Sequence, residues 1–176
     1  MIIGILKEGK IPPDRRVPLT PEKAAMVKDQ FDCKLIIQTS DIRCFSDEEY
    51  EEKGFKISND LANAEIILGI KEVPVSMLLP KKTYMFFSHT IKKQPYNRNL
   101  LQKILDRHIR LIDYEMLKNK KGQRVIAFGK FAGMVGAHNA IWTYAKRKKL
   151  FDLPRMKDIF SYDDAKEIYK STKNLL

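Results

Sequence analysis

Two short apolar runs constrain the fold more than any other feature of the chain. They cover residues 66–70 (IILGI) and 84–87 (YMFF), and each is rich in β-branched or aromatic residues. Because each is too short for an ordinary helix, each predicts a buried strand. Lys71 follows the first run, and Ser88 and His89 follow the second. Ligands bind at the carboxyl ends of strands in an open parallel sheet, so we expect Lys71 and His89 at a ligand-binding edge. Lys and His are also the side chains most easily tuned by their surroundings to exchange protons near neutral pH.

The rest of the chain alternates between strand and helix patterns. Further strands are predicted at residues 1–6, 34–38, 109–113 and 124–128, and residues 55–57 form either a brief strand or a loop. Helices are predicted at residues 21–30, 46–50, 97–107, 132–149 and 163–173, with one helical turn within 73–80. The alternation predicts an α/β fold with a largely parallel sheet of about six strands, flanked by helices and followed by a C-terminal helical extension.

Three other polar residues bear on the predicted ligand-binding edge. Arg16 lies in the loop after the first strand, where a guanidinium can hold a carboxylate through two parallel hydrogen bonds. Glu115 follows the 109–113 strand and should join the same edge, whereas Arg124 precedes its predicted strand and should lie at the opposite edge. Arg16, Lys71 and His89 each also have a plainer interpretation, because surface arginines and lysines are commonly solvated and a single histidine is often structural.

The glycines at 129, 133 and 136 follow a predicted strand and open a helix, which is the context of a dinucleotide-binding turn. Their spacing is G-x3-G-x2-G instead of G-x-G-x-x-G, and no acidic residue ends a following strand about 20 residues later. We interpret them as sites of close helix packing, with nucleotide binding as the lesser alternative. The sequence shows no Ser-His-Asp arrangement and no metal-ligand cluster.

The composition narrows the class of protein. The net charge of +11, from 33 Lys and Arg against 22 Asp and Glu, suits anionic ligands, but no nucleic-acid motif accompanies it, which argues against nucleic acid as a partner. No apolar run approaches the roughly 20 residues that cross a bilayer, and the first residues do not form a signal peptide. Cys33 and Cys44 match no metal spacing, so a reduced, cytoplasmic protein is the simplest expectation.

Several motifs together resemble a known family. They are LKEGK, DRRVPLTP, ILGIKEVP, YMFFSHTIK, IRLIDYE and RVIAFGKFAG, and they extend over most of the chain. The pattern resembles the N-terminal domain of the alanine dehydrogenase and pyridine-nucleotide transhydrogenase superfamily, which has a Rossmann-like fold. Within it, the pattern is most similar to the lysine-forming saccharopine dehydrogenases and the lysine–ketoglutarate reductase domain of the bifunctional lysine-degrading enzyme.

The resemblance implies roles for individual residues. Lys71 and His89 match the catalytic acid/base pair of enzymes that transfer hydride between NAD(P) and a C–N bond, and Arg16 matches the arginine that holds a substrate carboxylate. Positions lining the substrate cleft are matched by Lys7, Glu72, Lys92, Glu115, Arg124 and Phe128. For Arg124 this implication replaces the opposite-edge placement. The implied ligands are saccharopine, lysine and 2-oxoglutarate, whose carboxylates would complement a site rich in cations.

In the family a Rossmann cofactor domain follows, and we expect it to be absent from this chain. The resemblance therefore implies a substrate and catalytic α/β domain at residues 1–128, then a long connecting helix and C-terminal helical segment at 129–176. NAD or NADP is expected in the complete enzyme and none on this chain alone, so a nucleotide-binding domain is expected as a partner in cis or in trans. Whether the chain is a fragment or a stand-alone domain stays open, and a non-catalytic module that binds amino acids or keto acids is the main alternative.

Overall fold

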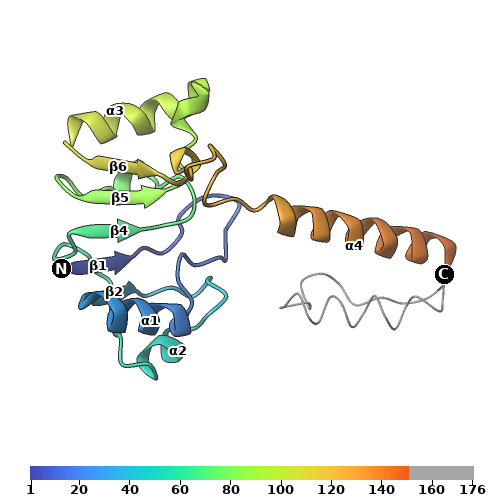
Figure 1. Cartoon of the computed structure of the whole chain (residues 1–176), viewed down its shortest axis with the longest axis horizontal. Coiled ribbons are helices and arrows are strands. Elements are labelled where there is room, and N and C mark those ends of the chain that lie inside the picture. The colour runs from blue at the N-terminus through green and yellow to red at the C-terminus, as the bar shows by residue number, and fades with distance from the viewer. Residues whose placement is uncertain (151–176) are drawn as a thin grey trace. The chain divides into compact units, whose positions relative to one another are not determined.

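A computed structural model describes residues 1–150 of the chain. It divides into two compact units, one from Met1 to Ile126 and a second that begins at Ala127. The first unit is built on a six-stranded, wholly parallel sheet in the order β3-β2-β1-β4-β5-β6 (Figure 1). The strands are β1 (Ile2–Ile5), β2 (Lys34–Gln38), β3 (Lys56–Ser58), β4 (Ile66–Leu68), β5 (Thr83–Phe86) and β6 (Arg110–Asp113). This confirms the predicted α/β class.

The strand order reverses between β1 and β4. From β1 the chain runs outward through β2 to β3, then returns beside β1 as β4 and runs outward the other way through β5 to β6. The loops after β1 and β4 therefore diverge from neighbouring strands at the carboxyl edge of the sheet. Such a topological switch point is where open α/β sheets bind ligands.

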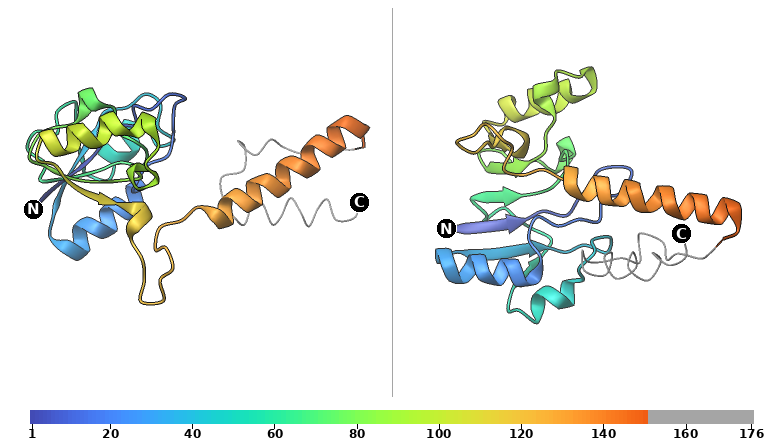
Figure 2. Two further views of the ribbon diagram at one scale, coloured as in Figure 1. Left: turned by 90° about the horizontal axis from the view of Figure 1, so that it is seen from above. Right: turned by 45° about the vertical axis from the view of Figure 1, so that its right-hand side comes forward.

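Helices cover both faces of the sheet. One core cluster packs Ala24 of α1 (Pro21–Phe31) and Tyr50 of α2 (Asp47–Glu51) against β1 and β2. The other packs Leu100 and Ile104 of α3 (Arg98–Asp106) against β4 and β5. Figure 2 shows α1 and α3 on opposite sides of the sheet. Strands covered on both faces lose the alternation of polar and apolar residues, which explains why β4 and β5 are continuous apolar runs.

Most predicted elements are present within a few residues of their predicted limits. The turn expected within 73–80 is η1 (Val75–Met77), and the short segments η2 (Thr90–Lys92) and η3 (Pro95–Asn97) precede α3. The 55–57 segment, predicted as either a brief strand or a loop, overlaps the strand β3 (Lys56–Ser58). The helix predicted at 163–173 lies outside the described residues. Within residues 1–150, no helix has the length and apolar content needed to cross a membrane.

The strand predicted at 124–128 is wrong. This segment makes only one isolated antiparallel bridge, between Lys118 and Arg124, and Val125 is 62% exposed. β-branched residues favour strands because they pack on a pleated, half-buried surface, and this segment has no such surface beneath it. The following helix, α4 (Gly129–Lys148), begins three residues before its predicted start.

The interpretation of Gly129, Gly133 and Gly136 as packing sites stays a prediction. Within residues 1–150, a Cβ built at any of the three meets no atom within 4 Å. Gly9, in the loop after β1, is different. A Cβ at Gly9 would lie 2.8 Å from Pro74 Cγ and 2.6 Å from Met77 Sδ. The loop after β1 thus passes closely over the segment after β4.

We expect Gly9→Ala to lower the free energy of unfolding by about 1–3 kcal/mol, because the rigid Pro74 ring cannot yield to the added methyl group. Gly133→Ala is the matched control, since it adds the same methyl group where there is open space, and it should be neutral or stabilising by up to about 1 kcal/mol. Urea unfolding of both variants measures the difference, and equal stability of the two would contradict the tight approach at Gly9.

Candidate active site

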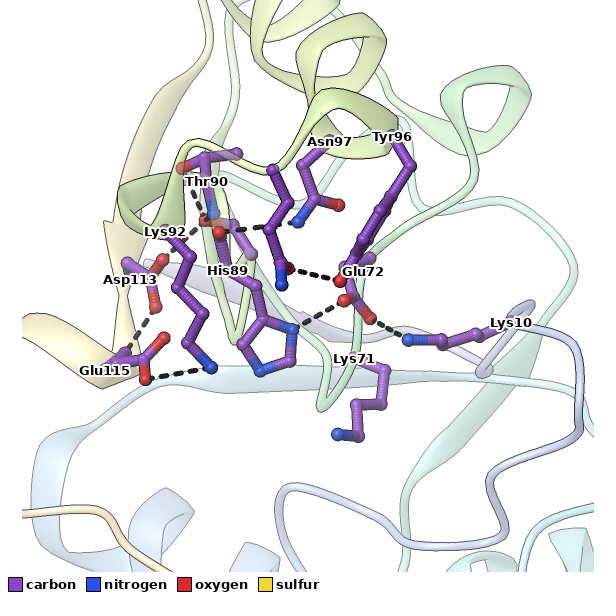
Figure 3. Close-up of polar contacts among 12 residues, drawn as sticks. Lys10, Lys71, Glu72, His89, Thr90, Lys92, Tyr96, Asn97, Asp113 and Glu115 are labelled. Carbon is purple, nitrogen blue, oxygen red and sulfur yellow. Dashed lines mark hydrogen bonds and ion pairs between the residues drawn. The ribbon is translucent and has the colours of Figure 1, made fainter.

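The carboxyl edge of the sheet gathers most of the residues that the sequence singled out (Figure 3). Lys71 and Glu72 follow β4, Ser88 and His89 follow β5, and Glu115 lies in η4 (Tyr114–Met116) directly after β6. Because β4, β5 and β6 are parallel neighbours, their carboxyl ends bring these side chains to one edge.

Glu72 connects the groups of this cluster. Its Oε1 lies 2.5 Å from His89 Nδ1, and its Oε2 lies 2.6 Å from Lys10 Nζ. Burial raises the pKa of Glu72, but the hydrogen bonds from Lys10 and His89 outweigh burial and hold that pKa below its usual range. An ionised Glu72 needs a donor at His89 Nδ1, so this nitrogen carries a proton. Within residues 1–150, His89 Nε2 has no hydrogen-bond partner, so it is the nitrogen left to exchange protons.

The backbone of His89 is left-handed, with a φ of 54° that few non-glycine residues adopt. Hydroxyl groups on both sides stabilise this turn. Ser88 Oγ lies 2.8 Å from Thr90 Oγ1 and accepts the Thr90 N–H at 3.1 Å. Ser88 Oγ also donates to Asp113 Oδ2 at 2.5 Å, which ties the turn to the end of β6. The His89 ring stacks on Phe87 with 6.3 Å between centroids, so both its backbone and its ring are held in place.

Glu115 forms a second charged group at the same edge. Its Oε1 lies 3.4 Å from Lys92 Nζ and 3.5 Å from Arg124 Nη1, and the Arg124 guanidinium lies 5.8 Å from the centre of the Phe87 ring. The other oxygen, Oε2, is buried and has no hydrogen-bond partner among residues 1–150. A buried acceptor without a donor costs about 1–3 kcal/mol, so a donor supplied by a ligand would be stabilised at this point.

The loop after β1 contributes a third pair. Arg16 donates from Nε to Asp14 Oδ1 at 2.9 Å and from Nη2 to Asp14 Oδ2 at 2.5 Å. These hydrogen bonds hold the pKa of Asp14 below its usual range despite partial burial. Lys7 is exposed just past the end of β1, and its main-chain N–H donates to Gln38 Oε1 at 3.1 Å. Arg16 is thus already oriented for a carboxylate, because it binds one.

The structure brings most of the predicted site residues to one edge, namely Lys71, Glu72, His89, Lys92, Glu115 and Arg124, with Lys7 and Arg16 on the loop after β1. The opposite-edge placement of Arg124 is wrong, because no strand carries it across the sheet and it pairs with Glu115. Phe128 belongs to the second unit, so its contact with substrate stays a prediction. Roles in substrate binding and catalysis are likewise still predictions for the others.

Sequence reasoning missed several residues of the site, namely Glu8, Lys10, Asp14, Ser88 and Asp113. Each follows or ends a strand at the carboxyl edge, or lies in the loop after β1, so position alone was an available signal. That signal is weak because every strand must end in some residue. Within residues 1–150, no group of three or more His, Cys, Asp or Glu side chains could hold a metal ion.

A parallel α/β domain with acidic and basic side chains converging at its switch point is the class that the fold and the site define. Comparison with known families makes the assignment specific. The chain belongs to the family described as alanine dehydrogenase/PNT, N-terminal domain, whose model matches residues 4–135. This confirms the family that the motifs predicted.

Individual relatives agree with the family. The mitochondrial alpha-aminoadipic semialdehyde synthase of Bos taurus is 44% identical over 128 residues, which are 73% of this chain and 14% of that protein. The L-lysine-forming, NAD(+) saccharopine dehydrogenase of Schizosaccharomyces pombe is 33% identical over 132 residues, which are 72% of this chain and 36% of that protein. The chain therefore spans only part of the length of these relatives.

A solved structure shares the fold. The transhydrogenase from Sinorhizobium meliloti superposes with a TM-score of 0.65 at 15% sequence identity, covering 82% of this chain and 44% of the transhydrogenase chain. The likeness supports the Rossmann-like parallel sheet, which was predicted from the motifs.

We expect Glu72→Gln to lower the free energy of unfolding at neutral pH by about 1.5–3 kcal/mol, because the amide loses charge-assisted bonds with Lys10 and His89. The pKa of Glu72 is lowered in the folded state, so its stabilisation is complete above the unfolded-state pKa and disappears as the pH falls through the folded-state pKa. The difference from wild type should therefore shrink below about pH 4.

Urea unfolding at a series of pH values measures this dependence. Glu65→Gln is the control, because Glu65 is an exposed carboxylate that accepts only one main-chain N–H, from Ile2 at 2.9 Å. A Glu72→Gln deficit that stays constant down to the acid end would contradict the ionised role of Glu72.

Proposed function

We propose that this chain is the substrate-binding and catalytic half of an oxidoreductase of the saccharopine dehydrogenase or lysine–ketoglutarate reductase type, acting on a C–N bond of an amino acid. The observation that carries the proposal is the linked series Lys10, Glu72 and His89 beside Lys71 at the switch point. Membership of the family and the similarity to a protein named as a saccharopine dehydrogenase supply the reaction class.

The proposed chemistry needs protons moved at nitrogen and at water, because an imine between an amine and a 2-keto acid is formed or hydrolysed. His89 Nε2 takes or gives one proton while Glu72 stabilises the imidazolium through Nδ1. Lys71, which extends beside this pair in Figure 3, is the second acid/base group. Two groups at one edge allow one to hold a proton while the other releases it.

The charges around the pair support an amino acid and 2-keto acid substrate. Arg16, Lys7 and Lys92 are cations at the carboxyl edge that suit the carboxylates of saccharopine or 2-oxoglutarate. The buried Glu115 Oε2, which lacks a donor within residues 1–150, suits a substrate amino group. A site with both signs of charge matches a substrate that also carries both.

NAD(P) supplies the hydride acceptor or donor in the complete enzyme, and residues 1–150 do not fit it. Gly129, Gly133 and Gly136 lie within α4, which does not follow a strand, and their spacing is not that of a dinucleotide-binding turn. A nucleotide-binding domain, in cis or in trans, is therefore the partner that the proposal requires. The free thiols of Cys33 and Cys44 suit a reducing compartment, and a cytoplasmic location is part of the proposal.

The isolated chain should bind 2-oxoglutarate or saccharopine weakly, and Arg16→Ala should weaken that binding roughly ten- to a hundredfold, since one charged bidentate contact is lost. Arg15→Ala is the matched control, because Arg15 is an exposed neighbour whose Nε donates to the Ile42 carbonyl at 3.2 Å. Calorimetry measures both variants. If they bind equally, Arg16 is not the carboxylate clamp.

Catalysis can be tested in a chimera of the S. pombe saccharopine dehydrogenase. In this chimera, the segment aligned over 132 residues is replaced by the corresponding part of the present chain. The chimera should reduce NAD+ with saccharopine and release lysine. Lys71→Met and His89→Gln should each slow turnover about 10²–10⁴-fold, which is the usual contribution of general acid/base catalysis, while NAD+ binding stays near normal.

The same substitutions at the amino edge serve as controls. Lys34→Met alters the first residue of β2 and His108→Gln alters a residue just before β6; both side chains are exposed, so the two substitutions should leave turnover unchanged. A chimera that turns over at the same rate with Lys71→Met and with His89→Gln would refute the acid/base pair. A chimera that binds NAD+ and saccharopine without turnover would favour the non-catalytic binding module.

A further inference from the structure

We propose that Glu8 is a positioning residue for Lys71, whose backbone it holds at the end of β4. The inference rests on the proposed function for its catalytic consequence, but its structural part can be tested without catalysis. Glu8 is 9% exposed and lies three residues after the end of β1. Its Oε1 accepts the Ile70 N–H at 2.7 Å and its Oε2 accepts the Lys71 N–H at 2.9 Å. Both carboxylate oxygens are thus committed to the residues that lead into the catalytic segment.

The main chain explains why a side chain is needed there. The Leu6 N–H donates to the Leu68 carbonyl at 2.9 Å, directly after the paired parts of β1 and β4. Beyond this point the loop after β1 turns away, and the N–H groups of Ile70 and Lys71 point toward it without main-chain acceptors. Glu8 supplies the two acceptors and so continues the contact between the two chains by a side chain. Buried N–H groups are nearly always paired, so this satisfaction is structurally required.

The other side of the same segment is held by β5. The Gly69 N–H donates to the Met85 carbonyl at 3.0 Å, and the Phe87 N–H donates to the Ile70 carbonyl at 3.0 Å. Lys71 therefore extends from a backbone that is held on one side by a strand and on the other by one carboxylate. Removing the carboxylate leaves the segment held on one side only, and the Lys71 ammonium at the end of four methylene groups amplifies any shift.

Burying the Glu8 carboxylate is unfavourable, because the charged group loses its solvation by water. Burial raises the pKa of Glu8 and the nearby Asp14 raises it further, while the two N–H groups and Arg16 lower it. A buried carboxyl group that served only to fill space would be replaced by an apolar side chain without loss. The two main-chain hydrogen bonds are what an apolar residue could not provide.

Glu8 and Glu72 have different tasks in this arrangement. The Glu72 side chain pairs with the side chains of His89 and Lys10. Within residues 1–150, the Glu8 side chain makes no hydrogen bond or ion pair with the side chain of Lys71 or His89 and binds the Lys71 main chain instead. Because Lys71 and Glu72 are consecutive, however, a shift of the 70–71 backbone would also move the carboxylate that orients His89. Glu8 thus acts on both proton-exchanging groups through one stretch of main chain.

The first test is amide hydrogen exchange by NMR on the full chain. Glu8→Gln keeps the size of the side chain but offers one acceptor and one donor, so at least one of the N–H groups of Ile70 and Lys71 loses its acceptor. We expect exchange at that amide to accelerate about tenfold or more. Glu65→Gln is the matched control at the amino end of β4 and should leave both amides unchanged. Unchanged exchange at Ile70 and Lys71 in Glu8→Gln would overturn the inference, whatever the enzyme's activity.

The second test is a double-mutant cycle in the chimera. Glu8→Gln should lower kcat roughly ten- to a hundredfold with KM changed by less than about threefold, and it should lower kcat much less when Lys71→Met is already present. A merely structural role would give equal losses in both backgrounds, and that additivity would overturn the inference. An inactive wild-type chimera would count against the proposed function alone, and the exchange measurement would still decide the role of Glu8.

Discussion

The reversal of strand order between β1 and β4 is the constraint on which the site depends. It separates two loops that begin side by side, so that the polar residues at their starts face each other across an edge that no crossover covers. Lys10 from one loop meets Glu72 from the other at this place. The pairing register of β1 with β4 sets where the two loops begin, and a slip of one residue would move every side chain of the slipped strand to the opposite face of the sheet.

Cations near the site are matched by carboxylates. Lys10 pairs with Glu72, Arg16 with Asp14, and Lys92 with Glu115, although the chain as a whole carries a net charge of +11. On the proposed function, a substrate carboxylate meets cations of which Lys10, Arg16 and Lys92 already have partners, so binding requires these pairs to be shared or exchanged. Such an arrangement favours discrimination between substrates over raw affinity, because only a ligand with complementary charges at each position compensates for the pairs that it disturbs.

Much of the fold could be predicted from the sequence because its signals are local. The apolar runs that became β4 and β5 need no distant partner to be recognised. The strand predicted at 124–128 was wrong because a strand depends on the surface against which it packs, and that surface is formed by residues far away in the sequence. Lys71 and His89 could be placed at the edge because each comes directly after an apolar run. The hydrogen bonds of Glu8, Asp14 and Asp113 could not be predicted, because they depend on contacts between segments that are not neighbours in the sequence.

The left-handed turn at His89 allows the side chain to be removed without a change in the backbone. A backbone with φ of 54° suits glycine best, so His89→Gly would keep the turn that the Ser88 and Thr90 hydroxyls stabilise. The space vacated by the ring would have Phe87 as one wall and the Glu72 carboxylate as an acceptor at its edge. Imidazole added to the solution could occupy that space and replace the lost side chain, so that a diffusible base of chosen basicity stands in for a residue of the protein.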